Sequence, residues 1–178
     1  MGDPIAEPRR IWWARPRKLC ALERPGGGGR THRPARRAAE IAYLQARGVR
    51  LVVSTMPTRH NLGHYERAGL DWHHVPVSRT SEGAGPLEEL VRLLRGELRR
   101  AGAVAIHGNL YTDFVAAVCA AHLHDQRGLD PAEGLRRAVA AGLGVTPEAC
   151  ALLGVRYEAV QPRSRMAAAT SSGRSVTT

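Results

Sequence analysis

The polar residues best placed for chemistry lie in one short segment between two apolar runs. The first run, 103–106, predicts a small buried strand, and the second, 114–123, predicts a buried helix because it is apolar almost all round. In an α/β sheet, ligands bind beyond the carboxyl end of a strand, where the next helix begins. We therefore expect a binding site in this turn, with these candidates: His107, Asn109, Tyr111, Thr112 and Asp113.

Metal and cofactor sites are not expected elsewhere in the chain. Four histidines lie close together in sequence, but spacing fixes no Asp, Glu or Cys partner for them, so loop and strand-end positions explain them better than a metal: His60, His64, His73 and His74. The glycine run at 26–29 lacks the spaced glycine and the Lys-Ser/Thr pair of a phosphate-binding P-loop, and we interpret it as a linker. No cofactor is predicted.

The three cysteines, Cys20, Cys119 and Cys150, are an odd number with no metal-like spacing. They indicate a reduced, cytoplasmic protein. Cys119 falls inside the apolar helix, so we expect it in the core. The first ten residues lack the apolar stretch of a signal peptide, and no run of apolar residues is long enough to predict a membrane span.

The formal charge of +10 raises the question of nucleic-acid binding, so its distribution matters. Residues 1–50 carry +8, residues 51–155 carry −1 and residues 156–178 carry +3. The expected core is therefore almost neutral, and nucleic-acid binding is not predicted. Lys18 is the one lysine among 26 basic residues, a bias typical of GC-rich genomes, and we expect a bacterial source.

The elements that must position the polar segment follow from hydrophobic periodicity and from glycines and prolines at helix ends. Strands are predicted at 18–22, 50–54, 71–75 and 103–106. Helices are predicted at 34–47, 61–68, 86–101, 114–123, 131–141 and 147–153. This alternation predicts an α/β fold, a single domain with a central, mostly parallel sheet flanked by helices.

The predicted domain spans residues 11–155. A basic lead occupies residues 1–10, and residues 156–178 are expected to form a disordered tail because they contain little to bury. We expect Trp12 and Trp13 to pack over the sheet edge; exposed, they would instead be an anchor for a partner.

The order and spacing of several short motifs resemble those of dual-specificity and related cysteine phosphatases. In that family a buried strand leads into a His-Cys-x-x-Gly-x-x-Arg-Ser/Thr loop and then a buried helix. Here Ala-Val-Ala-Ile-His at 103–107 leads without a gap into 108–115 and an apolar helix. Upstream and downstream, these segments are similar to family motifs: Gly48-Val49, Tyr65 to Leu70, His74 to Val77, and Gly128 to Arg136. The resemblance implies the phosphatase fold over about residues 12–154.

The resemblance also implies that the catalytic residues are missing. Gly108 occupies the position of the nucleophilic cysteine, whose thiolate attacks phosphorus. Phe114 replaces the arginine that holds the phosphate oxygens, and Val115 replaces the hydroxyl that assists the departing sulfur. Arg79 stands where the general acid is expected, and Tyr111 replaces the central glycine of the loop. The chain is therefore not expected to be a cysteine-dependent phosphatase.

Two alternatives concern the residues that remain. His107, the retained signature residue, is expected to structure the loop by hydrogen bonding; alternatively, His107, Tyr111 and Asp113 form a new acid–base set. Thr112 and Asp113 are expected to accept hydrogen bonds from the first N–H groups of the helix. Asp113 would then partly replace a bound phosphate, or be an ordinary N-cap.

Three functions fit this sequence. The first is a catalytically silent binding or regulatory module, which takes a protein partner or a small molecule at loop 107–114. The second is an enzyme whose loop acts on a small molecule that is not a phosphate ester. The third is a purely structural interaction module without an open pocket. The sequence gives no prediction of the oligomeric state.

Overall fold

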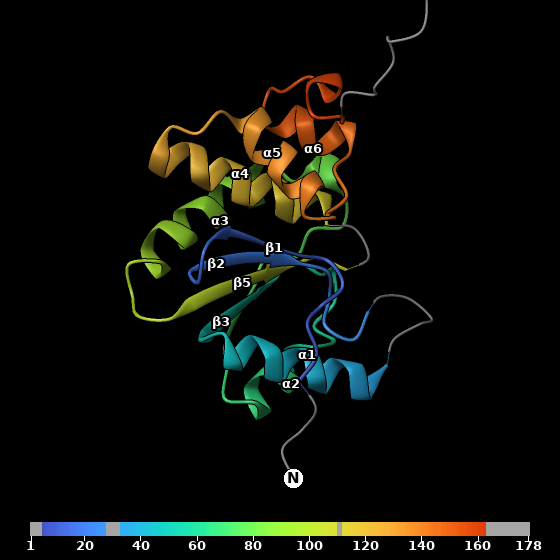
Figure 1. Cartoon of the computed structure of the whole chain (residues 1–178), viewed down its shortest axis with the longest axis vertical. Helices are drawn as coiled ribbons and strands as arrows, with labels where there is room; N and C mark the ends of the chain where they lie inside the picture. Colours follow the sequence, from blue (N-terminus) through green and yellow to red (C-terminus); the bar gives the residue numbers. More distant parts are fainter. Residues whose placement is uncertain (1–4, 28–32, 110–111, 163–178) are drawn as a thin grey trace, which may run out of the picture.

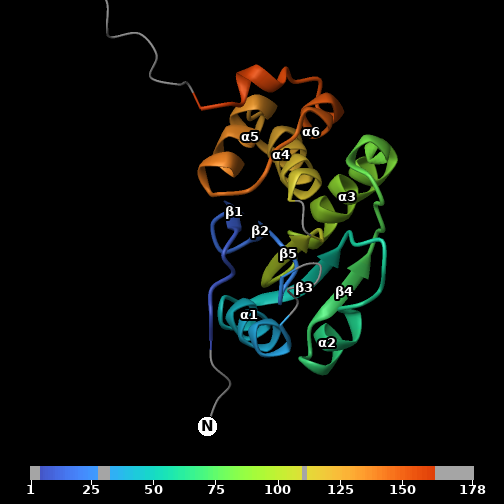
Figure 2. The ribbon, with the colours of Figure 1, turned by 90° about the vertical axis from the view of Figure 1, so that its right-hand side faces the viewer.

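The computed structural model describes residues 5–27, 33–109 and 112–162. Figures 1 and 2 show one sheet between two layers of helices. The strands are β1 (Ile11–Arg15), β2 (Leu19–Leu22), β3 (Val49–Ser54), β4 (Asp71–His74) and β5 (Ala103–His107). The helices are α1 (Pro34–Ala46), α2 (Leu62–Arg67), α3 (Ala84–Glu97), α4 (Asp113–Arg127), α5 (Pro131–Ala140) and α6 (Pro147–Leu152), with short 3₁₀ turns η2 (Thr80–Glu82) and η3 (Tyr157–Ala159).

The sheet has the strand order β1-β2-β5-β3-β4. Strands β2, β5, β3 and β4 are parallel to their neighbours, and only β1 pairs antiparallel, at the edge beside β2. The α/β prediction and each of the four predicted strands are confirmed. Strand β1 was not predicted as a strand. Its two tryptophans face opposite sides of the sheet: Trp12 lies in the core beneath α4, and Trp13 packs with residues of α1 and β3 on the other side.

The two faces of the sheet bury separate cores. Helices α3, α4, α5 and α6 cover one face, and α1 and α2 cover the other (Figure 1). Strand β5 is buried on both sides, as a central parallel strand requires. Because side chains alternate along a strand, Val104 and Ile106 point towards α4, whereas Ala103 and Ala105 point towards α1 and α2.

Helix α4 lies at the centre of the larger core. Its residues from Asp113 to Ala120 are all buried, and Cys119 is fully enclosed, as predicted. Helix α5 packs very closely against it, because a Cβ atom on Gly134 would lie only 2.9 Å from the Cβ of Ala120. The apolar pattern of the sequence therefore predicts α4 correctly. The small residues Gly134 and Ala120 set the distance between α5 and α4.

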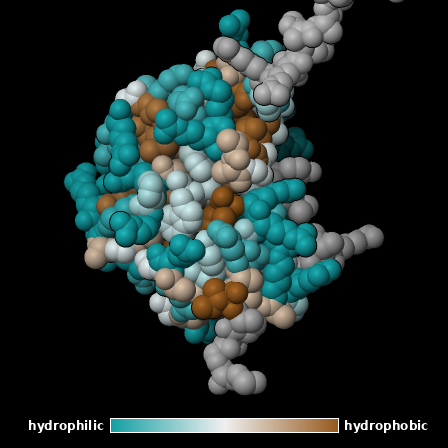
Figure 3. All heavy atoms as spheres, viewed as in Figure 1, coloured by the Kyte–Doolittle hydropathy of each residue, from teal (hydrophilic) through white to brown (hydrophobic). Residues whose placement is uncertain are grey.

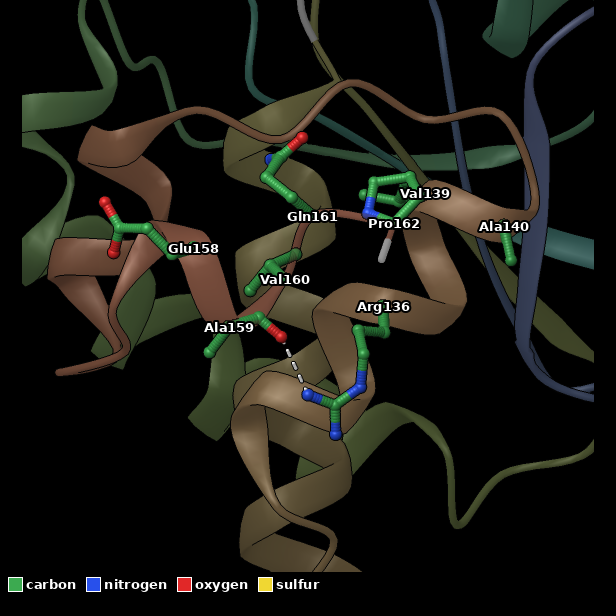
Figure 4. Close-up of a pocket in the computed structure, with 8 residues that line it drawn as sticks. All are labelled: Arg136, Val139, Ala140, Glu158, Ala159, Val160, Gln161 and Pro162. Atoms are coloured by element: carbon green, nitrogen blue, oxygen red, sulfur yellow. Dashed lines mark hydrogen bonds between the residues drawn. The ribbon is translucent and has the colours of Figure 1, made fainter. Parts of the chain in front are cut away.

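The folded part continues beyond the predicted boundary at residue 155. Residues 157–159 form η3, and Val160 is 1% exposed and belongs to the same core as α4. Arg136 of α5 donates a hydrogen bond to the carbonyl oxygen of Ala159 at 2.9 Å (Figure 4). The predicted disordered tail is therefore wrong for 156–162, since one valine and one backbone contact hold this stretch; residues 163–178 lie outside the described part.

The basic lead is also attached to the domain where it is described. The N–H of Ala6 donates to the carbonyl oxygen of Ala39, and Glu7 accepts a hydrogen bond from the Tyr43 hydroxyl at 2.7 Å. Within 5–27, 33–109 and 112–162, no helix is long and apolar enough to cross a membrane.

Candidate functional site

The carboxyl ends of three parallel strands meet at one edge of the sheet and surround a small cavity. Residues after β3, β4 and β5, together with the start of α4, enclose a volume of about 190 Å³. The described residues that line it are Thr55, Pro57, Val77, Ser78, Thr80, Gly108, Asn109, Asp113 and Phe114. This is where the sequence predicted a ligand site, since such sites lie where parallel strands end and helices begin. We call it the loop cavity.

Two hydrogen bonds from Thr55 hold the end of β5 beside the loop cavity. Both the N–H and the hydroxyl of Thr55 donate to the carbonyl oxygen of His107, at 2.9 and 3.1 Å. Gly108, the next residue, is buried and lines the cavity. Gly108, to which the resemblance assigns the position of the nucleophile, therefore lies at the cavity but has no side chain.

His107 supports the loop from beneath the sheet. Its ring is fully buried, with Nδ1 2.8 Å from the carbonyl oxygen of Gly108 and Nε2 2.9 Å from the hydroxyl of Tyr65. Since a carbonyl only accepts, Nδ1 carries the proton and Nε2 accepts from Tyr65. Burial lowers the pKa of His107 to about 4, while the hydrogen bond to Gly108 acts in the opposite direction. The imidazole is therefore neutral at pH 7 and fixed in one tautomer.

Tyr65 connects this histidine to α2. Burial raises the pKa of the Tyr65 hydroxyl well above its usual value, so it remains a hydrogen-bond donor. The side-chain amide of Asn61 contacts the same hydroxyl at 3.4 Å and the carbonyl oxygen of Pro25 at 3.2 Å. Tyr65 belongs to a segment that resembles the family, but no local signal in the sequence pairs it with a histidine 42 residues away.

Asp113 does not cap α4, contrary to the prediction. Neither Thr112, the N-cap residue, nor Asp113 makes a side-chain hydrogen bond to the first N–H groups of the helix. One carboxylate oxygen of Asp113, Oδ2, instead accepts from the hydroxyls of Thr80 and Thr146, both at 2.8 Å. The Thr112 hydroxyl oxygen accepts from the N–H of Gly144 at 2.8 Å. The reason is tertiary: η2 and the segment before α6 bring competing donors to the start of α4.

The carboxylate of Asp113 therefore joins three elements. Thr80 begins η2 in the loop after β4, and Thr146 is the N-cap of α6, where its hydroxyl also accepts from the N–H of Ala149. Asp113 is 4% exposed, and its second oxygen, Oδ1, has no hydrogen-bond partner among the described residues. Sequence reasoning missed both threonines, because each lies 33 residues from Asp113.

Of the remaining predicted positions Phe114, Val115 and Arg79, only Phe114 lines the same cavity. Phe114 is 5% exposed and packs against Gly83, where an added Cβ would overlap the phenyl ring. Val115 is fully buried in the core. Arg79 is exposed and does not line the cavity, although its neighbours Ser78 and Thr80 do. The described walls of the loop cavity thus contain a carboxylate and no basic side chain.

Two members of the alternative acid–base set, His107 and Asp113, share no hydrogen bond. The ring of His107 hydrogen-bonds to Tyr65 of α2 on one face of the sheet. Asp113 begins α4, which covers the other face. Their hydrogen-bond partners are separate. Tyr111, the third member, lies outside the described residues.

The four histidines considered as metal ligands are also not gathered into a site. Among the residues that the structure describes, no group of three His, Cys, Asp or Glu side chains could hold a metal ion. His74 instead lies 2.8 Å from the carbonyl oxygen of Met56, and His64 lies 2.9 Å from the guanidinium of Arg67.

No protein-family model and no curated protein matches this sequence. Solved structures do resemble it. Human DUSP28 is 21% identical, with a TM-score of 0.64 over 85% of this chain and 94% of that one. TpbA of P. aeruginosa is 18% identical, with a TM-score of 0.62 over 81% and 84% of the two chains. Tk-PTP is 21% identical, with a TM-score of 0.59 over 77% and 89%.

These structural neighbours are dual-specificity and protein tyrosine phosphatases. At this level of identity the similarity establishes the fold: a single α/β domain of the dual-specificity phosphatase type. The expected fold is therefore confirmed, along with the position of loop 107–114 between its central strand and buried helix.

Proposed function

We propose that this protein is a catalytically silent binding or regulatory module built on the phosphatase fold, which takes its ligand at the loop cavity. The observation that supports the proposal is the composition of that cavity. Its walls contain Gly108 and Phe114, which the family resemblance aligns with the nucleophile and the arginine, and the charged group in the described walls is the Asp113 carboxylate.

The electrostatics of the cavity disfavour a phosphate ester. Two unit charges 4 Å apart interact by on the order of 4 kcal/mol at the effective dielectric of a protein surface. A phosphate dianion beside Asp113 would be repelled by about this amount for each of its charges, with no guanidinium in the described walls to offset it. The proposal therefore covers the loss of phosphate binding as well as of phosphate cleavage.

No other cysteine replaces the missing nucleophile within the described residues. Cys119 lies in the second turn of α4, fully enclosed in the core, and burial raises the pKa of its thiol far above the usual value. Cys20 in β2 and Cys150 in α6 are likewise buried, and burial raises the pKa of both thiols. A thiol that stays protonated and enclosed cannot attack phosphorus.

The polar lining of the cavity favours a binding site over a purely structural module. Three hydroxyls, one amide and one carboxylate line it, from Thr55, Ser78, Thr80, Asn109 and Asp113. The ligand in this proposal is a protein partner or a small molecule. The three free, buried cysteines support a cytoplasmic location as part of the same proposal.

A hydrolysis assay tests the proposal. The purified chain should turn over an aryl phosphate no faster than the matched double variant His107→Ala, Asp113→Ala. A rate above background that either substitution abolishes would overturn it. The double variant Gly108→Cys, Phe114→Arg is the informative control, because it places a thiol and a guanidinium at these two positions of the loop.

A further inference from the structure

Two of the three hydroxyl groups in the described walls of the loop cavity donate their hydrogen to another residue. Thr55 donates to the carbonyl oxygen of His107, and Thr80 donates to Oδ2 of Asp113. A hydroxyl that donates its one hydrogen elsewhere can offer only lone pairs to a ligand. Two of the three hydroxyl side chains in the described walls therefore act as acceptors towards the cavity.

Two residues of the same walls each contain a buried acceptor oxygen without a donor among the described residues. Oδ1 of Asp113 and Oδ1 of Asn109 are buried without a hydrogen-bond partner among the described residues. Asp113 is 4% exposed, and no ion pair joins it to a described Lys, Arg or His. Buried polar groups without partners are rare in folded proteins, and an unpaired buried carboxylate oxygen is the costliest kind.

Arg10, which lines a neighbouring cavity, does not change this balance. That second cavity has a volume of about 330 Å³ and is also lined by Thr112, Asp113 and Thr146. The guanidinium of Arg10 lies 3.8 Å from the carboxylate of Glu23. The described walls of the loop cavity therefore carry one negative charge and unpaired acceptor oxygens, a combination that suits a cation.

We propose that the loop cavity binds a primary ammonium group on a short alkyl chain, with Asp113 as its counter-ion. This inference rests on the proposed function and names the ligand chemistry of that same site. An ammonium carries three N–H donors, which match the carboxylate, amide and hydroxyl oxygens of the walls. The apolar walls formed by Pro57, Val77 and Phe114 suit the methylene groups behind the charge.

The size of the cavity limits the ligand. About 190 Å³ is smaller than the range of roughly 300–1,000 Å³ typical of sites for drug-sized molecules. A lysine side chain of a protein and a free alkylamine both fit this description, since they share the ammonium and the short chain.

The first experiment measures the thermal stability of the full chain against n-butylammonium chloride. A ligand that binds only the native state raises the melting temperature in a saturable way. We expect this rise with n-butylammonium, and none with equal concentrations of sodium chloride, n-butanol or sodium phosphate. The absence of a rise, or an equal rise with phosphate or with sodium chloride, would overturn the inference.

Variants separate the site from a general effect of charge. Asp113→Asn keeps an oxygen for Thr80 and Thr146 but removes the charge, and should weaken n-butylammonium binding by at least about tenfold. Val77→Trp fills the cavity from a residue that makes no side-chain hydrogen bond in it, and should abolish binding while the unliganded protein stays folded. Glu82→Gln removes an exposed carboxylate nearby that does not line the cavity, and should leave binding unchanged.

Two peptides distinguish the sources of the ammonium. A short peptide with one internal lysine is compared with the same peptide acetylated on that lysine. Tighter binding of the lysine peptide than of n-butylammonium supports a protein partner, and binding of n-butylammonium alone supports a small amine. Binding of the acetylated peptide as tight as the unmodified one would overturn the ammonium assignment. Failure of all ammonium probes without aryl phosphate turnover would refute this inference and leave the proposed function standing.

Discussion

At the scale of single residues, two buried polar side chains hold parts of the fold together by hydrogen bonds on opposite faces of the sheet. His107 fixes the end of β5 through Tyr65 and Gly108, and Asp113 joins η2, α4 and the start of α6 through two threonine hydroxyls. A third, His122, lies fully buried in α4 with no hydrogen-bond partner on either ring nitrogen among the described residues. Each of these has a separate, measurable effect on stability.

Replacing Asp113 with alanine should destabilise the protein. The substitution removes the acceptor of two charge-assisted hydrogen bonds, which together contribute about 3 kcal/mol. Urea unfolding of the purified variant measures the change in free energy. The matched control is Glu82→Ala, which removes an exposed carboxylate from the same region and should change stability by less than about 0.5 kcal/mol. A loss no larger than that of the control would contradict the role given to Asp113.

Stability should fall as the pH is lowered from about 6.5 to about 4. Burial lowers the pKa of both His107 and His122 to about 4, so the unfolded chain binds these protons before the folded one does. The contribution of the two neutral histidines to stability is therefore complete above the pKa of histidine in the unfolded chain, about 6.5. It is lost as the pH falls from there to about 4, by up to about 1.4 kcal/mol per pH unit for each histidine. Urea unfolding at several pH values measures the slope.

His122→Leu should stabilise the protein at low pH and flatten this slope. Leucine fills similar space without burying unpaired ring nitrogens. Because leucine does not titrate, its contribution to the free energy of unfolding does not change with pH. We expect a gain of about 1 kcal/mol at pH 5. A pH dependence as steep as that of the unsubstituted chain would show that His122 is paired or remains protonated in the fold.

At the scale of elements, the distance between α4 and α5 is set by two small residues that face each other. A Cβ on Gly134 would lie 2.9 Å from the Cβ and 3.2 Å from the Cα of Ala120, and neither atom can rotate away. The close contact lets α5 cover α4, whose first two residues line the loop cavity. Small residues thus determine the packing of the helix that supports the site.

Gly134→Ala should therefore destabilise the fold although alanine is the better helix former. Overpacking costs about 1–3 kcal/mol, against a helix-propensity gain of about 1 kcal/mol. The matched control is Gly96→Ala in α3, where an added Cβ meets nothing within 4 Å and should stabilise by up to about 1 kcal/mol. Chemical denaturation of the two variants should give changes of opposite sign, and equal signs would contradict the packing argument.

At the scale of the whole molecule, two cores share one sheet, and the chain closes the larger core with residues after α6. On the face shown in Figure 3, hydrophilic side chains predominate and apolar ones form separate patches. Val160 returns to the core of α4 and α5, beside a groove of about 760 Å³ that Arg136 and Val139 also line (Figure 4). The folded unit therefore includes 156–162.

Val160→Ala tests how much that closure contributes. Removing two buried methyl groups should lower the free energy of unfolding by about 1–2 kcal/mol. Ala159→Gly, at an exposed neighbouring position that contacts Arg136 through its backbone, should have a smaller effect. Differential scanning calorimetry of both variants measures the change, and equal melting temperatures for Val160→Ala and the unsubstituted chain would show that the segment does not stabilise the fold.

The sequence by itself determined the α/β class, the parallel strands at 50–54 and 103–106, and the helix after residue 113. These follow from local signals: apolar runs for buried strands, a helix that is apolar all round, and glycines and prolines at the ends. It also placed His107, Gly108 and Phe114 around one loop, because strand and helix follow each other without a gap. Strand β1 was not predicted from the sequence. It is an edge strand of five residues that pairs only with β2, and no local pattern encodes that pairing.

The tertiary structure decided which partners these residues have. Asp113 had local sequence signals for an N-cap, yet Thr80 and Thr146, each 33 residues away, bind its carboxylate instead. His107 and Asp113, six positions apart, face opposite sides of the sheet. The segment 156–162, too polar to be predicted as folded, is held by Val160 and a backbone contact to Arg136. The physical reason is common to all three: hydrogen bonds and burial depend on groups distant in the chain, which no local pattern of residues encodes.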